Sequence, residues 1–304
     1  MGRNAIASSR SEPIAGPRLH SPRGTALSEI NFASEVFVPP RGGERIELCV
    51  LRSAHEARTA GIEGLLGHKG EPYLRHLQDF FGSDCNGTQD GLEWRFYAAF
   101  RHGVPVGVAC VWSAFGVGIL GHVYTVPEAR GLGIARQVLS LACQDFDKSG
   151  GSRLYLNTDA GSFQERLYAG LGFWPVGQIP GAMRRGGAQR VTSCPIGGKG
   201  RIVRFTWAHW PGLNEFLLRG EVRSRRWEAA DSMLPCSAEY AVLRAWYGGS
   251  EGPPTMAVLV DSADAVHGFA CQARPGGRIE VFTPDRLCCV RESLEKAVVA
   301  YSKS

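Results

Sequence analysis

The sequence lacks several features that would mark out particular classes of protein. No stretch reaches the ~18 consecutive apolar residues of a membrane span, and the N-terminus has no apolar core of a secretory signal. The eight histidines are scattered without the spacing of metal ligands, and no C-x-x-C pair occurs. We therefore expect a cytoplasmic protein with no metal centre and no membrane partner.

Cysteine usage argues against a disulfide framework. The nine cysteines are an odd number, and several lie in apolar runs such as GVAC and LSLAC. A reduced thiol in such a run behaves as a small apolar side chain. We expect reduced, buried cysteines, and Cys143 to be a core residue rather than a catalytic thiol, because no Cys-His-Asp arrangement supports one.

Charge and length limit the remaining classes. The net charge is +5, from 34 Lys+Arg against 29 Asp+Glu, and it is diffuse. A nucleic-acid binder usually shows a basic stripe with interleaved aromatics, and none is present, so no nucleic-acid partner is expected. The small positive balance suits an anionic cofactor. A chain of 304 residues favours two domains.

The N-terminal half alternates between two periodicities. Residues 1–44 are rich in Ser, Pro, Gly and Arg, which is typical of a largely disordered tail, with a short docking segment at NFASEVFVPP (31–40). Folded sequence is expected from residue 45, and its alternating order predicts an α/β domain with a mixed sheet over 45–190. The expected strands are 45–51, 93–100, 104–115, 118–126, 153–158 and 173–176, and the helices are 54–66, 72–81, 132–147 and 162–172.

The C-terminal half, 191–304, follows a Gly-rich polar linker at 186–200. A strand is expected at 201–207, helical material up to Tyr247, three strands within 255–282 and a last helix near 285–302. This order repeats the opening of the first half. It indicates a smaller α/β domain, interpreted as an internal duplication that breaks off early.

The most informative stretch runs from Thr125 to Ala135, TVPEARGLGIA. An apolar strand ends at a proline, and a glycine-rich turn leads directly into a helix. Glycines let backbone N–H groups approach a phosphate, and the helix N-terminus adds partial positive charge. The dinucleotide-binding pattern G-x-G-x-x-G fails here.

These residues resemble the GNAT superfamily of N-acetyltransferases. Arg130-Gly-Leu-Gly133-Ile-Ala135 is similar to the pyrophosphate motif R/Q-x-x-G-x-G/A of that family, after a strand that ends V-x-P. Leu167-Tyr168-Ala-Gly-Leu-Gly172-Phe173 resembles its L-Y-x-x-x-G-F signature. The resemblance covers residues 45–190. It implies a mostly antiparallel sheet splayed between its fourth and fifth strands and flanked by helices, with a degenerate GNAT-like copy as one interpretation of the C-terminal part.

The resemblance also implies the chemistry. Acetyl-CoA, or another acyl-CoA, would lie in the splay, and its acyl group would be attacked directly by a small-molecule amine. The cofactor-binding residues carried over from the motif are Arg130, Gly131, Leu132, Gly133, Ile134 and Ala135 for the pyrophosphate and Val123, Thr125 and Val126 for the pantetheine arm. Family members often carry an asparagine and an alanine where this chain has Gly161 and Gln164. Asn157 or Thr158, at the end of the preceding strand, is expected to replace the cofactor contact that those residues make in the family.

Two residues are the candidate catalytic groups. Tyr168 matches the general acid of the family, which protonates the departing thiolate. His122 is either a proton relay, since imidazole titrates near neutrality, or a half-buried strand histidine. Tyr124 faces the same side as His122 and lines the acceptor pocket or fills core.

The acidic residues near the cleft are less specific. Glu128 is expected in solvent. Asp84, Asp90 and Glu93 are a weaker hypothesis, an acidic rim that attracts an amine.

Alternative functions remain open at this point. A protein or peptide N-acetyltransferase would show an open groove, whereas a pocket capped by residues 200–304 would favour a small molecule. The third hypothesis is a non-catalytic CoA-binding module. The C-terminal part would shape the acceptor pocket or form a homodimer.

Overall fold

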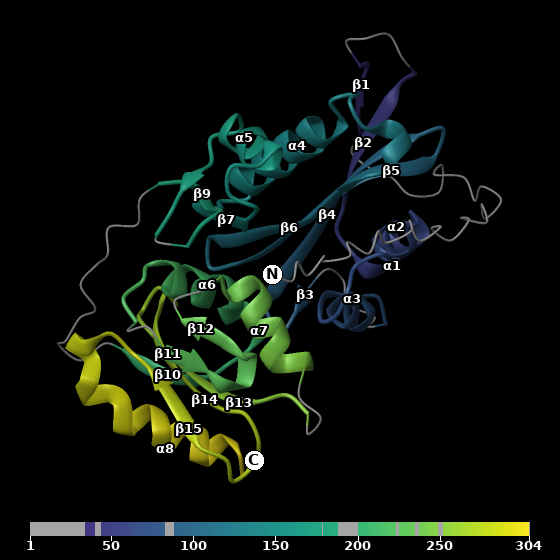
Figure 1. Cartoon of the computed structure of the whole chain (residues 1–304). Coiled ribbons are helices and arrows are strands. Elements are labelled where there is room, and N and C mark those ends of the chain that lie inside the picture. The colour runs from purple at the N-terminus through teal and green to yellow at the C-terminus, as the bar shows by residue number, and fades with distance from the viewer. Residues whose placement is uncertain are drawn as a thin grey trace, which may run out of the picture.

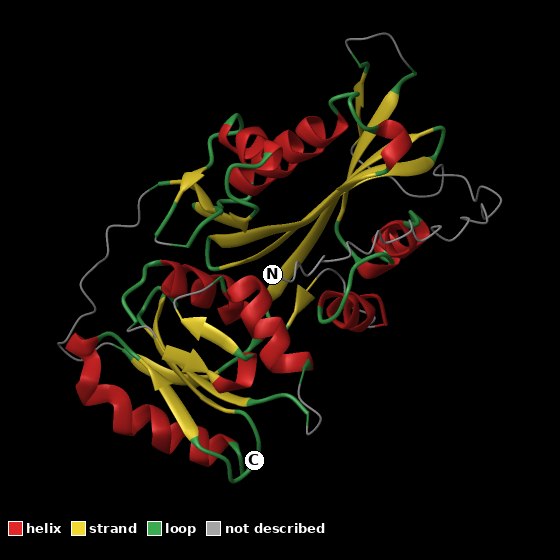
Figure 2. Ribbon diagram, in the orientation of Figure 1, coloured by secondary structure: helices red, strands yellow, loops and turns green. Residues whose placement is uncertain are grey.

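The computed structural model describes residues 34–39, 44–82, 88–177, 179–187, 200–222, 225–234, 237–248 and 252–303. Within them the strands form a large sheet, a four-stranded sheet and a two-stranded ribbon (Figure 1). Helices cover both faces of the large sheet (Figure 2). The expected mixed α/β fold with a mostly antiparallel sheet is confirmed. None of the helices in this part of the chain is long and apolar enough to cross a membrane.

The large sheet has the strand order β1-β2-β4-β5-β6-β7-β9-β8, with β3 beside β4. Every pairing is antiparallel except that of β6 with β7. Its strands are β1 Ser34–Phe37, β2 Ile46–Leu51, β3 Thr88–Gln89, β4 Leu92–Arg101, β5 Val104–Ala114, β6 Val117–Thr125, β7 Arg153–Asn157, β8 Trp174–Pro175 and β9 Ala182–Gly186. Its helices are α1 Ala54–Thr59, α2 Ile62–Leu66, α3 Tyr73–Gly82, the 3-10 turn η2 Pro127–Ala129, α4 Ile134–Lys148 and α5 Phe163–Ala169.

Two tight turns set the register of the central strands. The loop between β4 and β5 is His102-Gly103, with φ of 52° and 74°, and that between β5 and β6 is Phe115-Gly116, with φ of 52° and 73°. Positive φ at both central residues defines the hairpin turn whose twist matches the flanking strands. Glycine at the second position of each loop therefore favours these hairpins.

Several elements of the first half differ from the expectations. The helix expected over 54–66 is divided at Gly61. This glycine has a φ of 75°, which is not helical, and it separates α1 from α2. Only Trp174–Pro175 forms a strand in 173–176, and β9, which was not expected, pairs with β7 instead. Strand β1 lies before residue 45, within the segment expected to dock, and pairs with β2.

The second half forms the sheet β10-β13-β14-β15, which is antiparallel throughout. It contains β10 Arg201–Arg204, the ribbon β11 Arg225–Trp227 and β12 Ser232–Leu234, β13 Thr255–Val260, β14 Val266–Gln272 and β15 Ile279–Phe282. Its helices are η3 Trp207–His209, α6 Trp210–Leu218, η4 Glu228–Ala230, α7 Ala238–Tyr247, η5 Asp285–Val290 and α8 Arg291–Tyr301. The ribbon was not expected.

The second sheet repeats part of the first. Its order β10-β13-β14-β15 corresponds to β2-β4-β5-β6. The last strand of each set is followed by a proline, Pro127 or Pro284, then a 3-10 turn and a helix. Residues 285–290 contain no glycine, whereas Gly131 and Gly133 precede α4. The repeated unit therefore has the same strand order without a glycine loop.

The two halves share one core. Helices α4 and α5 cover one face of the large sheet, and α6 and α7 lie between its other face and the second sheet (Figure 1). Trp112 of β5 and Trp210 of α6, both fully buried, have ring centroids 5.0 Å apart. Apolar burial of this kind is the main favourable term in folding, so the second half stabilises the face of the sheet that it covers.

Candidate active site

Strands β6 and β7 pair over three residues and then part. Val117, Gly118 and Ile119 lie beside Arg153, Leu154 and Tyr155 in parallel register. Strand β6 continues to Thr125 and stays paired with β5 on its other side. From Leu120 onward, the edge of β6 that faces β7 has no strand partner among the described residues. An unpaired edge presents free N–H and C=O groups to an extended ligand. This opening in the sheet is the centre of the candidate site.

A β-bulge lies on β6 beside the opening. Gly121 pairs with Cys110 and Tyr124 with Val108, so His122 and Val123 stand opposite Ala109 alone. His122 has a φ of 51°, in the left-handed region that few residues other than glycine adopt. Bulges of this kind redirect side chains next to active sites. Here the bulge places both Gly121 and His122 on the face covered by the second half.

The glycine-rich turn follows the unpaired end of β6. Gly131 and Gly133 have φ of 80° and 79°, and Gly133 is the N-cap of α4 with no side chain capping the helix. A Cβ on Gly131 would meet no atom within 4 Å. Arg130 donates from Nε to the carbonyl oxygen of Thr125 at 3.1 Å and so ties the turn to β6. Exposed amides at a helix N-terminus fit the phosphates of a CoA thioester.

The other residues expected to bind the donor differ in how deeply they are buried. Ile134 packs in the core, and its Cγ2 would lie 2.7 Å from a Cβ on Gly107, so its side chain points away from the turn's surface and only its backbone could meet a ligand. Val123, Thr125, Val126, Leu132 and Ala135 are partly exposed, and Arg130 is exposed. Asn157 is exposed at the end of β7, where it pairs with Ala182 of β9.

Tyr168 lies on α5, on the face of the sheet that α4 covers. Ser162 caps this helix by accepting a hydrogen bond from the Glu165 amide at 3.1 Å, and the Glu165 carboxylate accepts one from Gly161. Tyr168 is 7% exposed and packs edge-on against Phe173. Burial, and then the charge of Glu239, raise the pKa of Tyr168 to about 12. The phenol therefore stays protonated at neutral pH.

His122 lies on the opposite face, among aromatic rings. It is 5% exposed and contacts Trp112 and Tyr73 edge-on, with ring centroids 4.9 Å and 5.6 Å away. Its Nε2 has no hydrogen-bond partner among the described residues. Burial, and then the charge of Lys69, hold the pKa of His122 well below its ordinary value, so its imidazole is neutral. Tyr124 shares this face and lies against His68.

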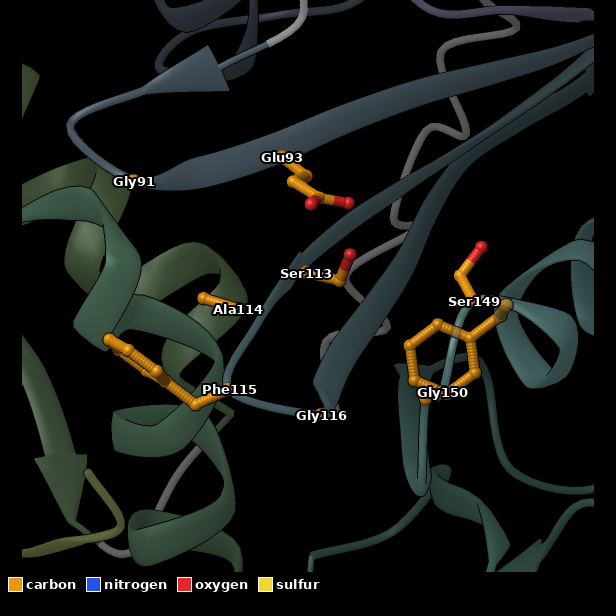
Figure 3. A pocket seen from close by; sticks show the side chains of 10 residues that line it. Gly91, Glu93, Ser113, Ala114, Phe115, Gly116, Ser149 and Gly150 are labelled. Atoms are coloured by element: carbon orange, nitrogen blue, oxygen red, sulfur yellow. The ribbon is translucent and has the colours of Figure 1, made fainter. Parts of the chain in front are cut away.

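The expected acidic rim lies elsewhere. Asp84 is outside the described residues. Asp90 lies in the turn between β3 and β4. Glu93 lies toward the C-terminal end of α4, because Arg95 bonds both Glu93 and Asp145, whereas the glycine turn precedes the N-terminal end of that helix. Glu93 pairs with Arg95 at 2.8 Å and lines a hollow with Ser113, Phe115 and Ser149 (Figure 3). Glu128 is exposed, and Cys143 is buried in the core with a pKa raised to about 11 by burial.

One group at the opening was not anticipated. Glu239 of α7 has its Oε1 3.1 Å from the Cβ that a side chain at Gly121 would carry. The Tyr73 hydroxyl lies 3.5 Å from the same oxygen. The position of Glu239 against β6 could not be predicted from the sequence around it. The residues near Glu239 indicate a helix, but they do not determine which strand that helix packs against.

Residues 69–173 match the family model of the acetyltransferase (GNAT) family. The chain is thus similar to this family over that region. No curated protein sequence matches the chain.

Several solved structures resemble parts of the chain. Escherichia coli ElaA is 19% identical, covering 46% of this chain and 99% of its own, with a TM-score of 0.36. The PaiA N-acetyltransferase from Thermoplasma acidophilum in complex with coenzyme A is 18% identical, with coverages of 46% and 99% and a TM-score of 0.34. A tandem GNAT protein from the clavulanic acid biosynthesis pathway is 12% identical, with coverages of 85% and 87% and a TM-score of 0.37.

Proposed function

We propose that this protein is an acyl-CoA-dependent N-acyltransferase that transfers an acetyl group from acetyl-CoA to a small-molecule amine. The observation that carries the proposal is the parting of β6 from β7 after Ile119, beside the uncapped N-terminus of α4. Both features lie within residues 69–173, which match the GNAT family.

The donor would be bound mainly by backbone groups. The amides of residues 131–135 would hold the pyrophosphate, because glycine at 131 and 133 leaves them accessible. The free edge of β6 at Val123, Thr125 and Val126 would pair with the amides of the pantetheine arm, as an added strand would. Asn157, exposed at the end of β7, would offer a side-chain amide.

Transfer would need one proton donor and one proton acceptor. The neutral amine attacks the thioester carbonyl carbon, the C–S bond breaks, and its electron pair goes to sulfur. Tyr168 would then give its phenolic proton to the thiolate. His122, a neutral imidazole with a free ring nitrogen, would relay a proton on the acceptor side.

The cover over the acceptor side supports a small molecule. Helices α6 and α7 lie over one face of the large sheet (Figure 1). On that face Trp112 contacts both His122 and Trp210 of α6, and Tyr124 packs against the same cluster. A peptide acceptor needs an extended groove, whereas a small amine fits beneath a cap of helices. Efficient transfer to peptide N-termini or lysines, with none to small amines, would redirect this assignment.

Thermal unfolding with CoA, acetyl-CoA and longer acyl-CoAs tests the donor site. Saturation at about a hundred times the Kd adds roughly 2.7 kcal/mol to the free energy of unfolding. Gly131→Glu should abolish this stabilisation by placing a carboxylate among the amides.

Gly150→Glu is the matched control for Gly131→Glu. Its φ is 82° against 80° at Gly131, and neither position has an atom within 4 Å of the new Cβ. The backbone strain is therefore the same, but Gly150 lies beyond the other end of α4. Absence of any shift in the unmodified protein would contradict the proposed function.

A further inference from the structure

The carboxylate of Glu239 lies beside the bulge of β6. A Cβ on Gly121 would be 3.1 Å from Glu239 Oε1, and Gly121 directly precedes His122. The pairing of β6 with β7 ends two residues before Gly121. Glu239 therefore stands at the opening, on the face opposite the one that carries Tyr168.

Contacts within the second half hold the backbone at Glu239 in place. The Ala238 amide donates to Asn214 Oδ1 at 2.9 Å, and Trp210 Nε1 donates to the Ala238 carbonyl at 2.9 Å. The Glu239 amide is itself capped by Ser237 Oγ at 3.3 Å. Helix α6 thus fixes the first turn of α7 against the large sheet.

The surroundings of the carboxylate suit an organic cation. Tyr73 lies 3.5 Å from Glu239 through its hydroxyl, and its ring neighbours Tyr240 at 5.9 Å and His122 at 5.6 Å. Aromatic faces attract ammonium groups, and the effect grows when the cation is partly desolvated. A carboxylate beside aromatic rings therefore suits a primary ammonium group.

We infer that Glu239, supplied by the C-terminal half, binds the ammonium group of the acceptor and accepts its proton before attack on the thioester. The acceptor class is a primary amine that is cationic in solution. This inference rests on the proposed function and adds a catalytic residue to it. The C-terminal half is then part of the active site.

The protons balance in this scheme. R–NH₃⁺ gives one proton to the Glu239 carboxylate, and the neutral amine forms the C–N bond. As the C–S bond breaks, sulfur takes the electron pair and then the Tyr168 proton, and the excess proton on nitrogen restores the phenol. Glu239 releases its proton to water, so one proton is released for each amide formed.

Electrostatics support Glu239 as the base. Burial raises its pKa to about 7, although Lys69 and Tyr73 oppose this shift. A general base is most effective when its pKa is near the working pH. His122 is less suited to the same role, because burial holds its pKa well below the ordinary value.

Several elements carry titratable groups that interact electrostatically with Glu239. They are Lys69 before α3, Tyr73 of α3, Cys110 of β5 and Tyr168 of α5. The pKa values of both tyrosines and of the thiol are raised, with burial as the largest cause, so all three stay neutral near pH 7. Lys69, whose pKa is lowered by burial, is the charged group among them. Its effect on the pKa of Glu239 can be measured by mutating it.

The test uses the full chain with 2-phenylethylamine as the acceptor probe. We expect this amine to stabilise the protein in the presence of acetyl-CoA, and to be acetylated, with kcat/KM falling as pH drops below about 7. Glu239→Gln should lower kcat at least 100-fold and remove that pH dependence. The thermal shift with acetyl-CoA alone should remain.

Two further variants sharpen the result. Lys69→Met should move the pH limb upward, because the lysine charge lowers the pKa of Glu239. Glu228→Gln, an exposed glutamate of the same half, should match the unmodified protein. If Glu239→Gln keeps its activity and pH limb, or if the amine neither binds nor reacts while acetyl-CoA still stabilises the chain, the inference is overturned and the donor site stands. Loss of the acetyl-CoA shift itself would remove the proposed function and the inference together.

Discussion

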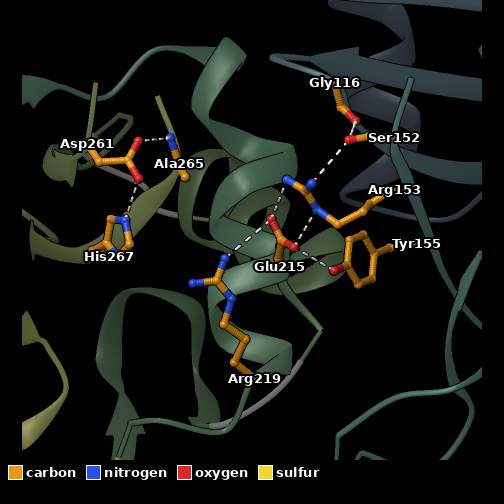
Figure 4. A network of polar contacts seen from close by, with 9 residues as sticks. All are labelled: Gly116, Ser152, Arg153, Tyr155, Glu215, Arg219, Asp261, Ala265 and His267. Atoms are coloured by element: carbon orange, nitrogen blue, oxygen red, sulfur yellow. Dashed lines mark hydrogen bonds and ion pairs between the residues drawn. The ribbon is translucent and has the colours of Figure 1, made fainter. Parts of the chain in front are cut away.

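Arg153 of β7 donates from Nε to Oε1 of Glu215 on α6 at a distance of 2.8 Å (Figure 4). Glu215 is 2% exposed, and the Tyr155 hydroxyl donates to the same oxygen, also at 2.8 Å. Arg219 lies 3.4 Å from the other carboxylate oxygen. This network joins the strand that parts from β6 to the C-terminal half, so it holds one side of the opening.

Glu215→Gln should therefore destabilise the whole chain. Removing one partner of a buried ion pair typically costs about 3–5 kcal/mol, because the remaining charge is left uncompensated. Chemical denaturation of the variant measures the loss. Glu221→Gln breaks the more exposed pair with Arg286 and should cost only about 0–1 kcal/mol. Equal effects of the two variants would contradict the role given to Glu215.

Gly121→Ala tests the close packing at the bulge. The new Cβ would lie 2.5 Å from Trp112 Cζ3 and 3.1 Å from Glu239 Oε1, and Trp112 is fully buried. We expect a loss of about 1–3 kcal/mol from overpacking, together with lower activity as Glu239 is displaced. Gly64→Ala, in α2 with no atom within 4 Å of its Cβ, should be neutral or stabilising by comparison.

Tyr168→Phe should lower kcat by about 100-fold or more through loss of the proton donor. Acetyl-CoA binding should persist, because the proposed donor contacts are backbone groups. Tyr155→Phe serves as the control, since its hydroxyl bonds Glu215 and its loss should affect stability rather than kcat. Unchanged steady-state kinetics in Tyr168→Phe would rule out the acid role.

Asp145 should contribute to acid unfolding. Burial raises its pKa, but hydrogen bonds from Tyr97 and Arg95 and the charge of Arg52 outweigh this, and the pKa is lowered. The folded state thus binds this proton less readily than the unfolded chain. The stability it provides is present above an unfolded pKa of about 4 and is lost as pH falls through the folded value.

Asp145→Asn should accordingly be less stable at pH 7 and lose less stability on acidification. Unfolding temperatures from pH 7 to about pH 2 would show this as a shallower curve. Glu128→Gln, which removes an exposed carboxylate, should keep the original curve. A parallel curve for Asp145→Asn would show that other carboxylates account for the acid limb.

Local patterns in the sequence were sufficient to predict much of the secondary structure of the first half. The turns at His102-Gly103 and Phe115-Gly116 need positive φ, and glycine at their second positions favours it. Apolar residues at three- and four-residue spacing predicted a helix over 132–147, and the structure has it at Ile134–Lys148. The ribbon β11–β12 and strand β9 were missed because strands of three to five residues carry too few alternations to form a pattern.

The sequence by itself determined the glycine turn at 131–133, the helix behind it and the family that this motif resembles. Those features depend on backbone conformation within a few residues, which glycine and periodicity encode directly. The tertiary structure alone decided that Glu239 meets Gly121 and Tyr73, and that Glu215 is buried beside Arg153. Contacts between residues so far apart in the chain arise from the packing of one half on the other, and no local pattern records them.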